Sequence, residues 1–144
     1  TLRDIYQSYE TLWTNALESV GSDPRNRLVA LLEADFCEAA CGPDVLPLWF
    51  AFWGELRFTE DYAAVADAFD TRRHEALLAL WSEILPDGSR EEVGQITEWM
   101  ETLTDGYWQS LHLTPGYYDR EGALRATKEL LARLVPGLLD IPAG

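Results

Sequence analysis

Apolar residues recur every three to four positions along almost the whole chain, and this helical periodicity is the strongest constraint on the fold. In the first segment, Ile5, Tyr9, Leu12 and Ala16 would form one stripe on a helix. No segment alternates apolar and polar residues as a half-buried strand does. The sequence therefore predicts an all-α fold of about six helices, over residues 2–20, 24–41, 43–58, 60–85, 90–113 and 120–135.

The ends of these segments carry residues that typically begin or end helices. Asp23 followed by Pro24 is an N-cap with proline at the first helical position. Ser89 with Glu92 has the spacing of a capping box, and Asp119 is another candidate N-cap. These residues support the predicted helix boundaries.

The third segment is apolar on every side of its predicted helix. Its large side chains are Leu48, Trp49, Phe50, Phe52, Trp53 and Leu56. A helix that is apolar all round is normally surrounded by other helices. We therefore expect this segment to be the central helix of the domain, where Gly54 would let a neighbour or a ligand approach closely.

The chain holds six Trp, six Tyr and five Phe residues, a large supply of rings for the core of one small domain. Trp49 and Trp53 project from one side of the third segment, and Tyr6 on the first segment could face them. Rings around a cavity hold quaternary ammonium groups by cation–π attraction, and Glu55 or Asp105 could add a counter-charge.

The predicted ligand site comprises Tyr9, Trp13, Phe36, Trp49, Phe50, Trp53, Glu55, Trp99, Tyr107 and Trp108. For any single ring, ordinary core packing is the more frequent role. The group as a whole favours a small-molecule ligand. A small cation such as choline fits these rings, and a flat hydrophobic molecule fits them equally well.

Acidic side chains outnumber basic ones by 25 to 11, which gives a formal net charge of −14. This charge repels phosphate backbones, so the chain alone should bind nucleic acid poorly. It favours solubility and, as a second possibility, a cationic ligand. No apolar run is long enough to span a bilayer, and no signal peptide opens the chain, so we expect a cytoplasmic protein without membrane contact.

The sequence offers no support for catalysis, a metal site or a cofactor, and it predicts a protein that is not an enzyme. Neither His74 nor His112 has a nucleophile or a carboxylate at a sequence spacing that would indicate a catalytic arrangement. Cys37 and Cys41 lie one helical turn apart, which suits neither a disulfide nor a complete metal site. We expect both to be free thiols in a reducing compartment.

The fifth and sixth segments each carry a second apolar line besides the one expected to face the core. One line could pack inward while the other meets a partner subunit. Two such helices from each of two chains would form a four-helix bundle. The predicted dimer interface comprises Trp99, Leu103, Gly106, Ser110, Leu124, Leu130, Leu131 and Leu134. The alternative is that all these residues serve a single core.

Three stretches are similar to one known family. They are NRLVALLEADF at 26–36, VLPLWFAFWGEL at 45–56 and TDGYWQSL at 104–111. In their order and spacing the chain resembles the C-terminal domain of TetR-family repressors, in particular the BetI-like subgroup that responds to choline-related compounds. The resemblance runs from Thr1 to about Gly137.

This resemblance implies that residues 1–144 are the effector-binding and dimerising domain of a homodimeric repressor. It also implies that a helix-turn-helix domain outside this sequence binds operator DNA. Ligand binding would then change the distance between the two helix-turn-helix domains of the dimer. Two other classes remain open. One is a small helical enzyme acting on a hydrophobic or cationic substrate, and the other is a helical protein-interaction domain without a small-molecule site.

Overall fold

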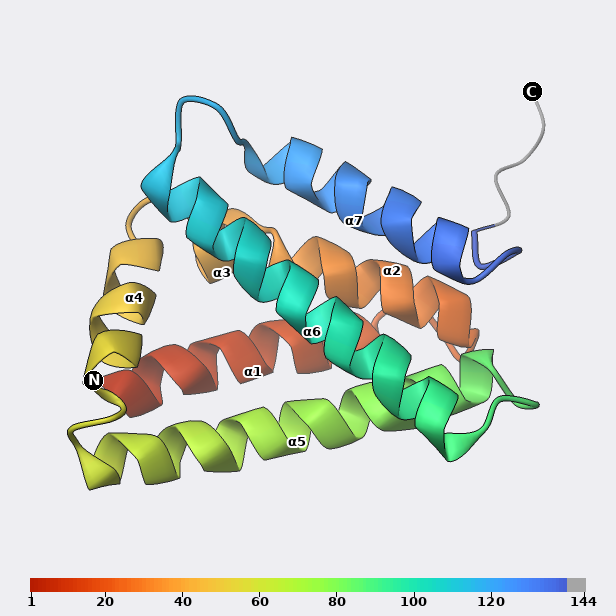
Figure 1. Cartoon of the computed structure of the whole chain (residues 1–144), viewed down its shortest axis with the longest axis horizontal. Coiled ribbons are helices and arrows are strands. Elements are labelled where there is room, and N and C mark those ends of the chain that lie inside the picture. The colour runs from red at the N-terminus through yellow and green to blue at the C-terminus, as the bar shows by residue number, and fades with distance from the viewer. Residues whose placement is uncertain (140–144) are drawn as a thin grey trace.

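The computed structural model describes residues 1–139, which form seven helices and no strand (Figure 1). The helices are α1 (Leu2–Glu18), α2 (Pro24–Asp35), α3 (Glu38–Cys41), α4 (Leu46–Glu55), α5 (Glu60–Ile84), α6 (Arg90–Leu113) and α7 (Arg120–Leu134). Because α3 is a single turn, the six longer helices confirm the predicted all-α architecture. Within residues 1–139, every helix is too short or too polar to cross a lipid bilayer.

The predicted caps form at the ends of these helices. Ser89 Oγ accepts a hydrogen bond from the Glu92 amide at 3.1 Å, and the Glu92 carboxylate accepts one from the Ser89 amide at 3.3 Å. Asp119 accepts a hydrogen bond from the Gly122 amide at 2.6 Å at the start of α7. Gly21 follows α1 with a φ of +83°, a left-handed conformation that favours glycine. Local sequence signals therefore fix these boundaries.

The prediction of one continuous helix over residues 24–41 is wrong, because α2 ends at Asp35 and α3 begins at Glu38. The interruption frees carbonyl groups that side chains from distant helices satisfy. Trp108 Nε1 donates to the Asp35 carbonyl at 2.9 Å, and Arg120 Nη1 donates to the Phe36 carbonyl at 3.3 Å. These partners lie far away in the sequence, so the local pattern contained no sign of the break.

The expectation that the third segment forms the central helix is also wrong. α4 lies across one end of the bundle, at the left of Figure 1, and only Leu46 and Trp49 on it are buried. Leu48 is 49% exposed. The central position belongs to α2, which packs against α1, α3, α5 and α7. The rings of α4 instead pack on the end of the bundle, and the Trp49 indole donates to the Ala40 carbonyl at 3.2 Å.

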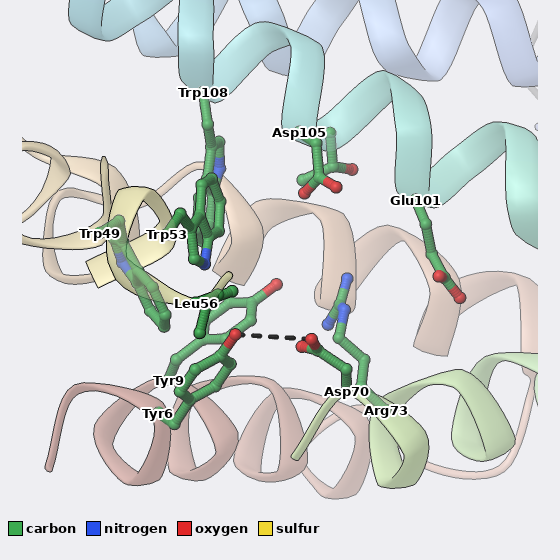
Figure 2. A pocket seen from close by; sticks show the side chains of 11 residues that line it. Tyr6, Tyr9, Trp49, Trp53, Leu56, Asp70, Arg73, Glu101, Asp105 and Trp108 are labelled. Carbon is green, nitrogen blue, oxygen red and sulfur yellow. Dashed lines mark hydrogen bonds between the residues drawn. The ribbon is translucent and has the colours of Figure 1, made fainter. Parts of the chain in front are cut away.

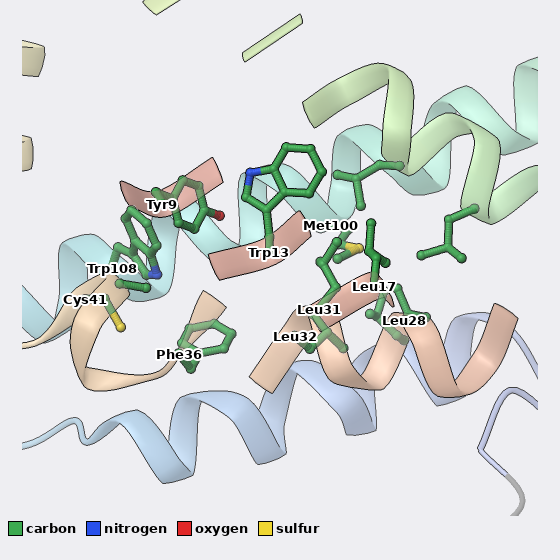
Figure 3. Close-up of a cluster of buried hydrophobic side chains, with 14 of the residues drawn as sticks. Tyr9, Trp13, Leu17, Leu28, Leu31, Leu32, Phe36, Cys41, Met100 and Trp108 are labelled. Carbon is green, nitrogen blue, oxygen red and sulfur yellow. The ribbon is translucent and has the colours of Figure 1, made fainter. Parts of the chain in front are cut away.

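The hydrophobic core fills the space between α1, α2 and α6 and extends to α5 and α7 (Figure 3). Leu17 and Leu28 come from α1 and α2, and Met100 reaches the same cluster from α6. Buried threonines do not interrupt this core. Thr97 and Thr127, for instance, donate to the carbonyl one turn earlier at 2.8 Å, so their hydroxyls are satisfied within their own helices.

One charged group is completely enclosed in this core. Asp35 on α2 accepts hydrogen bonds from the Tyr9 hydroxyl and from Arg73 Nη2, both at 2.6 Å. Burial raises the pKa of the Asp35 carboxyl. Burial alone would lower the pKa of Arg73, but the adjacent Asp35 carboxylate outweighs this effect and raises it, so Arg73 keeps its charge. The Tyr9–Asp35–Arg73 network thereby ties α1, α2 and α5 together.

Breaking this network should destabilise the protein strongly. Asp35→Ala leaves the Arg73 charge without its partner, and we expect the free energy of unfolding to fall by about 3–5 kcal/mol. Urea denaturation followed by circular dichroism measures this change. Glu10→Ala is the matched control, because it removes the more exposed Arg72–Glu10 pair at 3.0 Å. The control should lose less than about 1 kcal/mol, and equal losses in the two variants would contradict this account.

Candidate ligand-binding site

A cavity of about 310 Å³ opens between α1, α4, α5 and α6 (Figure 2). Its walls are formed by Tyr6, Tyr9, Trp49, Trp53, Leu56, Asp70, Arg73, Glu101, Thr104, Asp105 and Trp108. The indole rings gather at one end, and the carboxylates lie toward the other (Figure 2). The volume falls at the lower end of the range in which proteins bind small molecules. The cavity therefore suits a compact ligand.

The aromatic end is built from side chains of three helices. The Trp53 and Trp108 rings stack with centroids 6.2 Å apart and an interplanar angle of 11°. Trp49 lies against both, with its centroid 5.7 Å from Trp53 and 5.6 Å from Trp108. Tyr6 meets Trp49 edge to face at 4.8 Å. Several ring faces and edges thus surround one space, as in sites that bind alkylated ammonium groups.

The acidic end carries three carboxylates. Asp70 projects from α5, and Glu101 and Asp105 project from α6 (Figure 2). Solvent reaches both Asp70 and Asp105. Partial burial, together with the neighbouring charge of Glu101, raises the pKa of Asp70 to about 6, although the hydrogen bond from Tyr6 opposes this rise. Partial burial also raises the pKa of Asp105 to about 6, with the charge of Asp70 as the next cause. The two aspartates are thus charged at neutral pH in a region that disfavours their charge.

The only basic residue in this wall is Arg73, and its charge is already balanced. Arg73 Nη2 bonds Asp35 behind the cavity, whereas Arg73 Nη1 is buried and has no hydrogen-bond partner within residues 1–139. Asp70 receives one long hydrogen bond, from the Tyr6 hydroxyl at 3.5 Å. The cavity therefore keeps a negative excess and one unused donor.

The structure brings together some of the predicted ligand residues and separates others. Tyr9, Trp49, Trp53 and Trp108 line the cavity. The others lie outside it: Trp13 lines a neighbouring space of about 10 Å³, Phe36 packs on Tyr107, Phe50 stacks on His112, and Glu55 and Trp99 face solvent. Of the two counter-charges expected from the sequence, Asp105 lines the cavity and Glu55 does not.

Sequence reasoning missed Asp70, Arg73 and Glu101 as wall residues. A weak signal was present, because Glu101 and Asp105 are four residues apart and share one face of α6. Nothing in the sequence connected α5 with α6 at this point. His74 on α5 also has a carboxylate partner that its neighbours in sequence did not reveal, with Nδ1 lying 2.6 Å from Glu101 Oε1.

A second hollow, the outer groove, runs between α6 and α7. It holds about 620 Å³ and is lined by Glu98, Trp99, Thr102, Leu103, Gly106, Tyr107, Ser110, Tyr118 and Leu130. It thus contains all the α6 residues predicted for the dimer interface, which are Trp99, Leu103, Gly106 and Ser110. Leu130 and Leu134 of α7 are 41% and 42% exposed, and Leu124 is half-buried. Leu131 is the exception, because it is buried in the core of its own chain and cannot meet a partner.

Residues 1–139 contain no group of three or more His, Cys, Asp and Glu side chains arranged to hold a metal ion. Cys37 and Cys41 are free, and burial raises the pKa of the Cys41 thiol to about 12. The ring-lined cavity holds four of the predicted ligand residues, and the outer groove holds the predicted interface residues of α6.

The two cavity aspartates should reduce stability at neutral pH. A raised folded-state pKa means that folding favours the protonated acid, so stability decreases as pH rises from about 4 through about 6. Asp70→Asn and Asp105→Asn should each raise the melting temperature at pH 7.5. The free energy of unfolding should rise by at most about 1 kcal/mol, because solvent screens both groups. The gain should shrink at pH 4.5. Scanning calorimetry measures it, and a loss of stability at pH 7.5 would contradict the assignment.

The fold has a close match among solved structures. A protein from Pseudomonas aeruginosa PAO1 assigned as a transcriptional regulator superposes with a TM-score of 0.85 at 21% sequence identity. The match covers 94% of this chain and 66% of that chain. At this identity the likeness shows the fold alone. The chain thus spans about two thirds of the length of this relative.

Sequence comparisons identify the family. The chain is 25% identical over 135 residues to the HTH-type transcriptional regulator BetI of Burkholderia ambifaria, covering 94% of this chain and 68% of that protein. It is 28% identical over 131 residues to BetI of Paraburkholderia xenovorans, covering 90% of this chain and 63% of that protein. A family model described as BetI-type transcriptional repressor, C-terminal, matches residues 24–136. The chain therefore belongs to the BetI-type group of TetR-family transcriptional regulators, of which it represents the C-terminal part.

Proposed function

We propose that this chain is the effector-binding and dimerising part of a transcriptional repressor and that its signal is a small organic cation. The cavity between α1, α4, α5 and α6 carries the proposal. It combines ring faces with three carboxylates and a single arginine whose charge is already paired. These features favour an alkylated ammonium ion over a neutral flat molecule.

The position of α1 suggests how a ligand could act at a distance. The family match describes a C-terminal part, so we place the DNA-binding head before Thr1. α1 begins at Leu2 and contributes Tyr6 and Tyr9 to the cavity wall. A ligand that favours one position of α1 would favour dimers with one particular distance between their two DNA-binding heads. The reason is that binding selects the conformation with the better contacts.

The outer groove is the proposed dimer interface. Two copies of α6 and α7 would enclose Trp99, Leu103 and Leu130, which lie exposed or half-buried along it. A β-carbon added at Gly106 would meet nothing within 4 Å, so α6 has open space there for a closely packed partner helix. Burying these side chains against a second chain would remove apolar surface from water.

Loss of one cavity ring should weaken cation binding without removing the core. Trp53 is half-buried, so Trp53→Leu should leave the fold intact while lowering choline affinity roughly 5- to 30-fold, equivalent to about 1–2 kcal/mol. Isothermal titration calorimetry measures the affinity. The matched control is Phe58→Leu, which changes an exposed ring outside both the cavity and the outer groove. An unchanged affinity in Trp53→Leu, or an equal loss in both variants, would exclude Trp53 from the site.

Disruption of the outer groove should separate the two subunits. The parent chain should be a dimer in light scattering at roughly tens of micromolar, where standard interfaces normally hold. Leu130→Glu places a charge in the groove and should give a monomer with unchanged helix content. Leu48→Glu is the control, because Leu48 is similarly exposed but lies on α4. A monomeric parent chain would disprove the proposed interface.

A further inference from the structure

We propose that the effector is a dication, with one alkylated ammonium among the rings and a second ammonium between the carboxylates. This inference rests on the proposed function and specifies its ligand class as aliphatic diamines and related polyamines. It follows from three features of the cavity: its uncompensated charge, the separation of its two ends and its limited volume.

The charges around the cavity do not cancel. Arg73 is neutralised by Asp35 through the 2.6 Å contact behind the wall. His74 lies 2.6 Å from Glu101 and can offset that carboxylate when it is protonated. Arg72, which directly precedes Arg73 in the sequence, is paired with Glu10 at 3.0 Å and is not a wall residue. Each nearby basic group thus already has an acidic partner.

Asp70 and Asp105 form no ion pair with a described residue, and the nearby charge of Arg73 offsets only part of the burial that raises their pKa values. The only hydrogen bond to Asp70 comes from the neutral Tyr6 hydroxyl at 3.5 Å, and Asp105 accepts none. The remaining ionisable wall group, Tyr9, donates a hydrogen bond from its hydroxyl to Asp35 and carries no charge. A monocation would leave one of the two aspartates uncompensated, whereas a dication balances both.

The layout of the cavity separates the two positive charges. Trp49, Trp53 and Trp108 gather at one end, while Asp70 and Asp105 approach from α5 and α6 toward the other (Figure 2). An ammonium that carries methyl groups suits ring faces because it cannot donate many hydrogen bonds. A primary ammonium has three donors, which suit carboxylate oxygens. One short aliphatic chain could therefore present both groups within about 310 Å³.

The experiment compares two probes that differ only in the second charge. They are (3-aminopropyl)trimethylammonium and (3-hydroxypropyl)trimethylammonium, which have the same number of non-hydrogen atoms. Calorimetric titration of the 144-residue chain at pH 7.5 and low salt gives both affinities. The aminopropyl compound should bind at least about tenfold more tightly, since its additional charge lies beside two carboxylates. Its advantage should decrease as salt is added.

Variants of the two aspartates show whether the preference comes from these carboxylates. Asp70→Asn and Asp105→Asn should each remove most of the tenfold preference while changing the affinity for the hydroxypropyl compound much less. Glu75→Gln is the control, because it removes an exposed charge from α5 outside the cavity. It should preserve the preference. Thermal melts confirm that each variant is folded.

The outcomes separate this inference from the proposed function. Equal affinities for the two probes, or tighter binding of the hydroxypropyl compound, would overturn the dication and leave a cation sensor standing. A preference that survives in both aspartate variants would also overturn it. Absence of binding by both probes at millimolar concentration would overturn the cationic effector itself, and the dication with it.

Discussion

The buried carboxylate of Asp35 holds together the part of the bundle on which the ring-lined cavity depends. Its side chain accepts hydrogen bonds from Tyr9 of α1 and Arg73 of α5, and its backbone carbonyl accepts one from Trp108 of α6. Tyr9, Arg73 and Trp108 are also wall residues of the cavity. A single residue of α2 therefore orients one wall side chain from each of three other helices.

This arrangement explains why a buried ion pair, whose charges are costly to desolvate, lies beside an open cavity. A buried charge is tolerated only when its partners satisfy it, and such a network has few alternative geometries. Around Asp35, that requirement fixes the positions of Tyr9 and Arg73, which apolar packing alone would allow to vary. The network thereby orients the cavity wall, which would reduce the ordering needed to bind the proposed ligand.

The cavity aspartates illustrate a different balance. Asp35 is enclosed and partnered, whereas Asp70 and Asp105 lie in a partly desolvated space and form no ion pair within residues 1–139. Their raised pKa values, each about 6, express the same unfavourable environment. When a site holds unpaired charge of one sign, a ligand of the opposite sign relieves that unfavourable charge and therefore binds more tightly. Stability given up at neutral pH is thus consistent with a role in recognition.

The sequence by itself determined most of the helices, several of their caps and the class of the fold, because periodicity and capping act over a few residues. It placed Ser89 and Asp119 correctly at helix starts, and it found the exposed line on α6. It also supplied the family through short stretches in the right order. The caps and the apolar lines are encoded within one turn or one helix, and the family is encoded in the order of the stretches.

The tertiary structure alone decided what the apolar and charged residues do. It turned α4 from an expected central helix into the end of the bundle, and it buried Leu131 within its own chain. It also placed Asp70 beside Asp105, although they lie on different helices. The physical reason is that periodicity reports which side of a helix is apolar but not which helix will face it. Contacts between distant segments, such as Trp108 with the Asp35 carbonyl, settle that choice only when the whole bundle packs.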